Sequence, residues 1–148
     1  MNEYGPWWDS TITIYNKFKD KDTDKVTWYR TVLDNCFYQH TQNEVTVGQA
    51  KIASDVSICR IPVNTAFKDK RAWNELPGES KSQYFTLAPN DIIVAGNVDF
   101  EINEYEKGKR SSDLFAEYKE WPGCFTVKSA NINVGKGRGN EHYHARGV

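Results

Sequence analysis

The sequence predicts an all-β protein, a small β-barrel or barrel-like sandwich with a long central loop and one short α-helix. Aromatic residues make up 14% of the chain and five of its residues are Trp, and such large flat side chains pack well on pleated sheets. Short β-type segments recur between turn-forming residues, a spacing typical of barrels and sandwiches. With 148 residues and no internal repeat, the chain is expected to form one domain.

The first half is expected to form five short strands. Ile12 and Ile14 share one face of the first segment, and a charged turn over residues 20–24 follows it. Asp34-Asn35 and the region of Gly48 separate later segments, because these residues favour turns. The expected strands are residues 11–18, 26–33, 36–40, 44–48 and 55–61.

The second half begins with a long loop over residues 62–83, whose Pro, Gly and charged residues follow no regular period, with a helical turn around RAWNEL. Residues 91–96 and 98–102 are expected to form the centre of the sheet, because the second of these segments alternates cleanly between apolar and acidic residues. Residues 111–120 predict the single helix, capped by Ser111 or Ser112, with an apolar stripe and a Pro-Gly stop. In the strand 124–134 the apolar parity changes, which predicts a bulge near Ser129.

Residues 1–10 precede the first expected strand and form an aromatic arm before the barrel domain of residues 11–148. Trp7 and Trp8 are adjacent in this arm, and two neighbouring Trp side chains are unfavourable in water. They are expected to pack either on their own barrel or on a neighbouring subunit, where Trp is a common anchor.

Composition and charge exclude several classes of protein. The net charge of −1 gives no electrostatic case for a dedicated nucleic-acid binder. No secretory signal and no apolar run of membrane-spanning length is visible, so no membrane association is expected. The three cysteines form no CxxC pair, which predicts buried thiols made in a reducing cytoplasm rather than a disulfide framework or zinc site.

The stretch VGKGRGNEHYHARGV at residues 134–148 combines glycines with basic residues and histidines. A phosphate loop would need a helix after the glycines, so a basic hairpin turn carrying Lys136 and Arg138 is expected instead. His142 and His144 share one strand face, as two metal ligands would, but the only other histidine is His40 and no further ligand is apparent. We therefore expect no metal, no cofactor and, without a catalytic motif, no enzyme.

The arrangement of these segments resembles a known family. TITIYNKF with a charged hairpin and TWYRTVLDNCFYQH, then APNDIIVAGNVDFEI, a short helix, and FTVKSANINVGKGRGNEHYHARG are similar to the small neck proteins of long-tailed phages and prophages. Such head-closure, or stopper, proteins are small β-barrels. The resemblance covers about residues 11–147.

The resemblance implies a structural protein of the virion neck, made in the bacterial host cytoplasm. It would form a ring of itself, a hexamer or else a dodecamer, beneath the portal and adaptor, and would provide a surface for tail-completion or tail-tube proteins. Channel DNA would touch it only transiently and without sequence specificity. The expected contacts come from the arm, from the loop 62–83 and from the last hairpin: Trp7, Trp8, Lys68, Lys70, Arg71, Trp73, Lys136, Arg138, His142 and His144.

Two alternatives of other classes remain at this point. A carbohydrate- or ligand-binding β-sandwich would stack an exposed Trp73, Trp121 or Tyr on sugar rings. A metal-dependent nuclease would use His142 and His144 as ligands.

Overall fold

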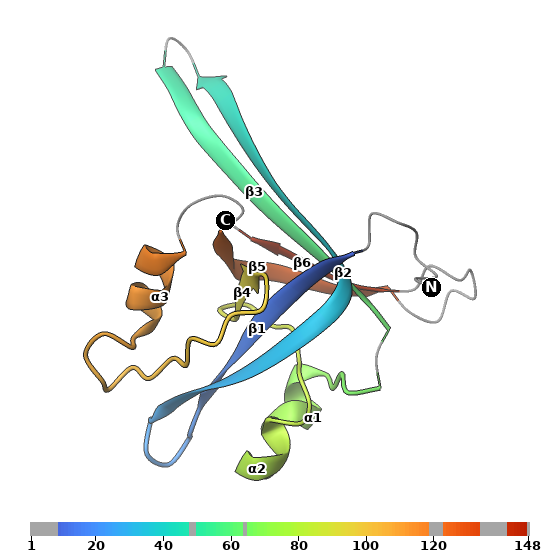
Figure 1. Cartoon of the computed structure of the whole chain (residues 1–148), viewed down its shortest axis with the longest axis vertical. Coiled ribbons are helices and arrows are strands. Elements are labelled where there is room, and N and C mark those ends of the chain that lie inside the picture. The colour runs from blue at the N-terminus through green and yellow to red at the C-terminus, as the bar shows by residue number, and fades with distance from the viewer. Residues whose placement is uncertain (1–8, 48–49, 64, 119–122, 134–141, 148) are drawn as a thin grey trace.

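The protein is a closed antiparallel β-barrel with two excursions packed against it and one long hairpin projecting from it (Figure 1). The computed structural model describes residues 9–47, 50–63, 65–118, 123–133 and 142–147, with the backbone alone for residues 41–47, 50–55 and 133. The strands are β1 (Ser10–Lys19), β2 (Val26–Val47), β3 (Ala50–Pro62), β4 (Ile92–Ala95), β5 (Cys124–Asn133) and β6 (His142–Gly147). Their order around the barrel is β1-β2-β3-β6-β5-β4, which confirms the predicted fold class.

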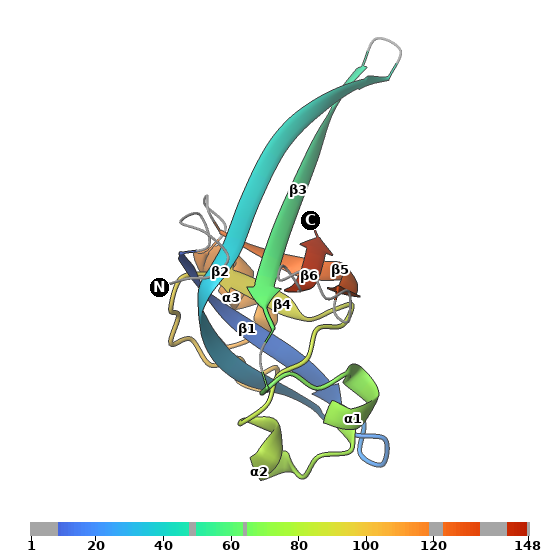
Figure 2. The same cartoon turned by 90° about the vertical axis from the view of Figure 1, so that its right-hand side faces the viewer.

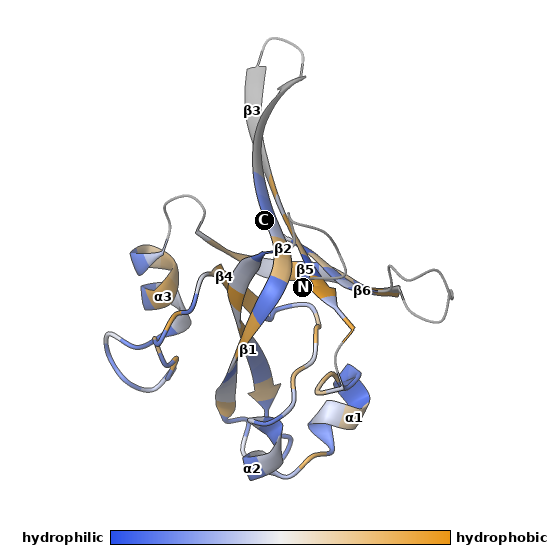
Figure 3. Ribbon diagram, turned by 45° about the vertical axis from the view of Figure 1, so that its right-hand side comes forward, coloured by the Kyte–Doolittle hydropathy of each residue, from blue (hydrophilic) through white to orange (hydrophobic). Residues whose placement is uncertain are grey.

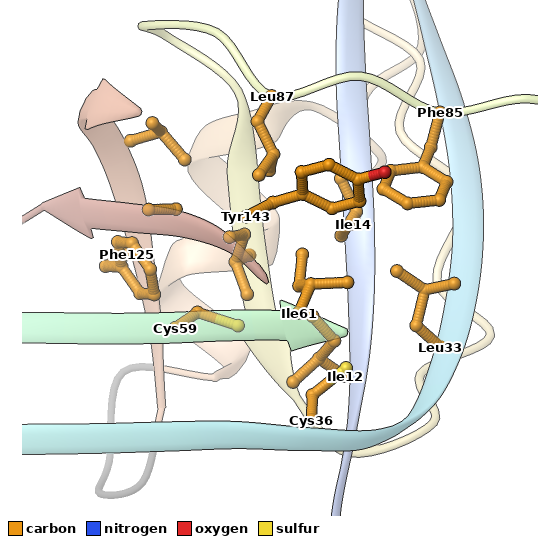
Figure 4. Packing of buried hydrophobic residues seen from close by; sticks show 13 residues of the cluster. Ile12, Ile14, Leu33, Cys36, Cys59, Ile61, Phe85, Leu87, Phe125 and Tyr143 are labelled. Atoms are coloured by element: carbon orange, nitrogen blue, oxygen red, sulfur yellow. The ribbon is translucent and has the colours of Figure 1, made fainter. Parts of the chain in front are cut away.

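The barrel interior is filled by alternate residues of the strands, as the period of two requires, together with Phe85 and Leu87 from the excursion between β3 and β4 (Figure 4). Ile12 and Ile14 of β1, expected on one face of the strand, are both fully buried, and the ring of Tyr143 lies beside Ile14. Apolar and polar colours accordingly alternate along the barrel strands (Figure 3). Among the described residues no helix is long and apolar enough to cross a membrane.

The strand β2 is longer than predicted. The segments expected as three separate strands form one strand of 22 residues, which first pairs with β1 and then with β3. Asn35 has a positive φ of 59°, and the register between β1 and β2 shifts near it. Asp34-Asn35 therefore bends the strand from one partner to the next rather than ending it.

The segment 98–102, expected at the centre of the sheet, is not a strand. Val98 and Ile102 are buried and Phe100 is half-buried on the side that the alternation predicts. The backbone of the segment, however, bonds to side chains instead of a neighbouring strand. Val98 N–H donates to Thr13 Oγ1 at 2.9 Å, and the Tyr15 hydroxyl donates to the Phe100 carbonyl. Side-chain partners thus replace the ladder, and a second apolar cluster forms outside the barrel from Tyr15, Ile92, Val94, Val98, Ile102 and Leu114.

Three short helices lie in the described excursions, where one was expected. The helix α3 (Ser111–Glu117) matches the prediction, but its N-cap is Arg110, whose N–H donates to Asp113, rather than either serine. The loop after β3 contains α1 (Lys70–Asn74) and α2 (Gly78–Lys81). The first of these contains the helical turn expected around RAWNEL.

A buried carboxylate joins the first excursion to β1. Asp91 is fully buried and accepts hydrogen bonds from Lys17 N–H at 2.9 Å and from Asn16 Nδ2 and Ala88 N–H at 3.0 Å. Burial raises the pKa of Asp91 to about 6, because these bonds do not fully replace water around the charge.

The last two strands agree with their prediction. The register between β5 and β6 shifts between Val127 and Ser129, which confirms the expected bulge. On β6, Tyr143 and Ala145 are buried, and His142, His144 and Arg146 lie on the opposite face.

Candidate functional site

The β2–β3 hairpin extends far beyond the barrel (Figures 1 and 2). β2 pairs with β1 only as far as Cys36, and β3 pairs with β6 only from Ser57. Beyond these limits residues 41–47 pair with residues 50–56 in continuous antiparallel register, and we call these two segments the ribbon. Seven residues per strand correspond to about 24 Å. Among the described residues no third strand pairs with either outer edge of the ribbon.

The base of the ribbon is held by side chains from both strands. His40 Nδ1 lies 2.6 Å from Ser57 Oγ, and the ring of Tyr38 packs on Phe125 at 5.9 Å between centroids. A serine beside a histidine is also the pair that nucleophilic enzymes use. Ser57 is fully buried, however, and lies directly opposite His40 in the ladder. We therefore interpret this contact as one that holds the two strands together.

One outer face of the barrel is basic. Arg60 on β3 lies directly opposite His144 on β6, and His142 and Arg146 point to the same side two residues away on β6. We call these four residues the basic face. The Arg60 guanidinium lies 5.1 Å from the centre of the Phe37 ring.

The environment of His144 is cationic. Its pKa is lowered, first by burial and then by the neighbouring charges of Arg60, His142 and Arg146. His144 Nε2 is covered, and no hydrogen-bond partner for it lies among the described residues. At neutral pH the two arginines therefore supply the permanent charge of this face.

The two histidines share a face, as the metal hypothesis required. Their ring centroids are 6.2 Å apart. Within the described part of the chain no three His, Cys, Asp or Glu side chains come together in a group that could hold a metal ion. The neighbours of His144 are cations, which disfavours a further positive ion at this position.

The loop residues proposed as contacts are more buried than expected. Trp73 is fully buried and packs edge-on against Tyr29, at 5.5 Å between ring centroids. Lys70 Nζ donates to the Lys17 carbonyl at 2.8 Å, and Lys68 lies over the Tyr84 ring. The expectation that Trp73 is exposed is therefore wrong. This side chain is part of the packing that holds α1 against the β1–β2 hairpin.

Arg71 alone of these loop residues is exposed. Trp7, Trp8, Trp121, Lys136 and Arg138 lie outside the described residues.

A groove of about 650 Å³ lies along the first part of β2, and sequence reasoning did not find it. Residues 25–30 line it together with Tyr15, Ser82 and residues between Glu101 and Lys109. Val26 N–H donates to the hydroxyl of Tyr105 at 2.9 Å. No local pattern signals this contact, because the two residues are 79 positions apart.

A family model matches residues 7–148 of the chain, which therefore belongs to DUF6751, a family of unknown function. No curated protein and no solved structure matches the chain.

Proposed function

We propose that this member of DUF6751 is a structural protein of the phage head-to-tail junction. Its copies would form a ring beneath the portal and adaptor, as a head-closure or stopper protein does, line the DNA channel and present a surface to the tail. The ribbon is the observation that carries the proposal. The sequence resemblance supplies the setting, a virion neck assembled from chains made in the host cytoplasm.

The ribbon is unfavourable in an isolated chain. A two-stranded hairpin without further strands is marginally stable in water, and its unpaired edges are sites where other chains add. The ribbon extends by about 24 Å from the barrel, with residues 41–47 and 50–56 paired to each other alone among the described segments. Contact with neighbouring copies would cover these edges.

A ring follows if the ribbon of each copy contacts a different surface on the next copy. Such heterologous contacts generate a closed ring when the rotation between copies closes. The contact does not depend on whether six or twelve copies complete the ring.

The basic face suits the expected transient contact with DNA. Arg60 and Arg146 supply two permanent charges, and the opposing residues of the ladder, Asn131 beside His144 and Ser129 beside Arg146, are polar and uncharged. Few phosphate contacts give weak binding that depends strongly on salt. A weak contact is compatible with DNA that must pass through the ring.

The carbohydrate-binding alternative named Trp73 and Trp121 as exposed rings for a sugar, and Trp73 does not meet this requirement. Trp73 has an exposed fraction of 0% and cannot stack on a sugar in this fold. Its indole N–H donates to the Tyr84 carbonyl instead.

Electron cryomicroscopy of phage particles from a host that carries this chain with an affinity tag tests the proposal. The expected result is a tagged ring on the particle axis between the portal and the tail. A second preparation carries a chain in which residues 42–55 are replaced by Asn-Gly, so that Thr41 and Val56, which face each other in the ladder, are joined by a two-residue hairpin turn.

The shortened chain is expected to fold but to be missing from the particles, which would then lack tails. The matched control replaces the exposed turn of residues 21–24 by Asn-Gly and is expected to assemble normally. Absence of the tagged full-length chain from all particles would refute the proposed function.

A further inference from the structure

The first part of β2 is an unpaired strand edge. Residues 26–36 pair with β1 on one side, but pairing with β3 on the other side begins only at Phe37. In an antiparallel ladder the backbone groups of alternate residues point to the same partner. Val26 directs its N–H away from β1, to the hydroxyl of Tyr105. By the same alternation the N–H and C=O groups of Trp28 and Arg30 also point away from β1.

The groove described above follows this edge. Its lining includes successive residues of β2, Thr27 and Tyr29 from one face of the strand and Trp28 and Arg30 from the other. Ser82, directly after α2, and residues between Glu101 and Lys109 also line it. A lining drawn from both faces of β2 is what a groove along the open edge of this strand produces.

The side chain of Tyr105 already occupies part of this edge in the way that a strand would. The Tyr105 oxygen takes the place that a carbonyl of an added strand would take at Val26, and Tyr105 is 59% exposed. Trp28 Nε1 is covered and has no hydrogen-bond partner among the described residues. The outward backbone N–H and C=O groups of Trp28 and Arg30 match an extended peptide, which supplies main-chain donors and acceptors at alternate positions.

We propose that this groove binds the ribbon of a second copy of the chain by strand addition. The inference deepens the proposed function and rests on it for the ring, since it names the surface on the next copy that the ribbon contacts. Each copy supplies both halves of the contact: an edge of five residues from Val26 to Arg30 in the groove, and ribbon edges of seven residues each.

The positions of the two halves on the chain favour a contact that propagates. The ribbon projects from one end of the molecule, and the β1–β2 turn with α1 and α2 lies at the opposite end (Figure 2). A ribbon that enters the groove of the next copy leaves its own groove open for the preceding copy. This is the heterologous arrangement that closes rings.

Two variants separate the halves of the contact. The chain with residues 42–55 replaced by Asn-Gly has a groove but no ribbon. The variant Ser82→Trp has a ribbon but places a large side chain in the groove. Glu79→Trp is its matched control, because Glu79 is exposed on the adjacent helix α2 and lies outside the groove lining.

Sedimentation velocity over a range of protein concentrations measures the assembly. Wild type and Glu79→Trp are expected to form the same concentration-dependent oligomers, and the two single-half variants are expected to remain monomers. A mixture of the two variants is expected to form one-to-one dimers that grow no further, because only one ribbon and one open groove meet. The affinity of this dimer should fall more than tenfold when Trp28 in the groove-bearing partner is replaced by Pro, which removes its N–H.

Several results would overturn the inference. These are a monomeric wild type at every concentration, oligomers of Ser82→Trp like those of wild type, or a mixture that stays monomeric. Assembly of the ribbonless chain by itself would show that another segment occupies the groove. A one-to-one dimer from a chain that is absent from phage particles would instead keep this inference and refute the proposed function.

Discussion

Replacing Gly147 by Ala should destabilise the barrel, because β6 passes too close to β5 for a side chain at this position. Gly147 is the last residue of β6 and pairs with Ser57 on one side and Val127 on the other. An added Cβ would lie 1.9 Å from the backbone oxygen of Thr126 and 2.5 Å from Cδ2 of Phe125. Comfortable contacts between such atoms are about 3.5 Å, so the two strands must move apart by more than an ångström.

The stability lost in Gly147→Ala depends on which atoms must move to make room for the added Cβ. The nearest atom belongs to the backbone of a paired strand and cannot rotate away, as the end of a flexible side chain could. Overpacking of this kind costs about 1–3 kcal/mol, and each ladder hydrogen bond lost as β6 separates costs a further ~1 kcal/mol. We expect a loss of about 3 kcal/mol in the free energy of unfolding, which corresponds to a Tm lowered by roughly 6–12 °C in a domain of this size.

The matched control is Gly78→Ala at the start of α2. Its added Cβ would meet the Tyr29 hydroxyl at 3.6 Å, an ordinary contact, and alanine in a helix is favoured over glycine by about 0.5–1 kcal/mol. Thermal unfolding of both variants, followed by near-ultraviolet circular dichroism, measures the difference. A Gly147→Ala variant that unfolds within 1 °C of wild type would refute the reasoning from the close approach of β5 and β6.

Three further predictions follow from buried and charged groups. Trp73→Ala should lower the free energy of unfolding in urea by about 3–5 kcal/mol, because the indole fills the contact between α1 and β2. Trp73→Phe should lower it by less than half of this. Equal losses in the two variants would contradict the packing argument. Because the pKa of Asp91 is raised to about 6, folded chains bind more protons than unfolded chains between about pH 4 and pH 6. The stability of wild type relative to Asp91→Asn should therefore fall by about 3 kcal/mol as the pH rises through this range, and a constant difference would exclude a raised pKa. The double variant Arg60→Gln and Arg146→Gln should bind duplex DNA with a weaker salt dependence: the slope of the logarithm of the association constant against the logarithm of the salt concentration should fall by about 2. Fluorescence anisotropy measures this slope, with Lys21→Gln as the surface control. An unchanged slope would remove the basic face from the DNA contact.

Much of the barrel could be predicted from local patterns. The alternation at Ile12 and Ile14 identified the inner face of β1, and the change of parity before Ala130 identified the bulge in β5. These features depend on the period of two along a strand, which is a property of neighbouring residues. His142 and His144 were assigned to one outer face for the same reason.

Other features depend on residues far apart in the sequence. The alternation at residues 98–102 correctly indicated one buried face, but the backbone found its partners in side chains such as Thr13 and Arg30. Trp73 was expected at the surface because it lies in a long loop without a regular period, yet the β1–β2 hairpin covers it. Burial at these positions is decided by which segments meet in space.

Some of the candidate contact surfaces likewise follow from one segment, and others depend on several segments. The fold class, the inner and outer faces of the strands and the shared face of His142 and His144 could be predicted, because each follows from the order of apolar and polar residues along one segment. The extension of β2 and β3 past the barrel as a ribbon, and the open edge of β2 in a groove, become visible only in the assembled fold. Pairing along a strand depends on where its partners begin and end, and here those partners are set by the closure of the barrel.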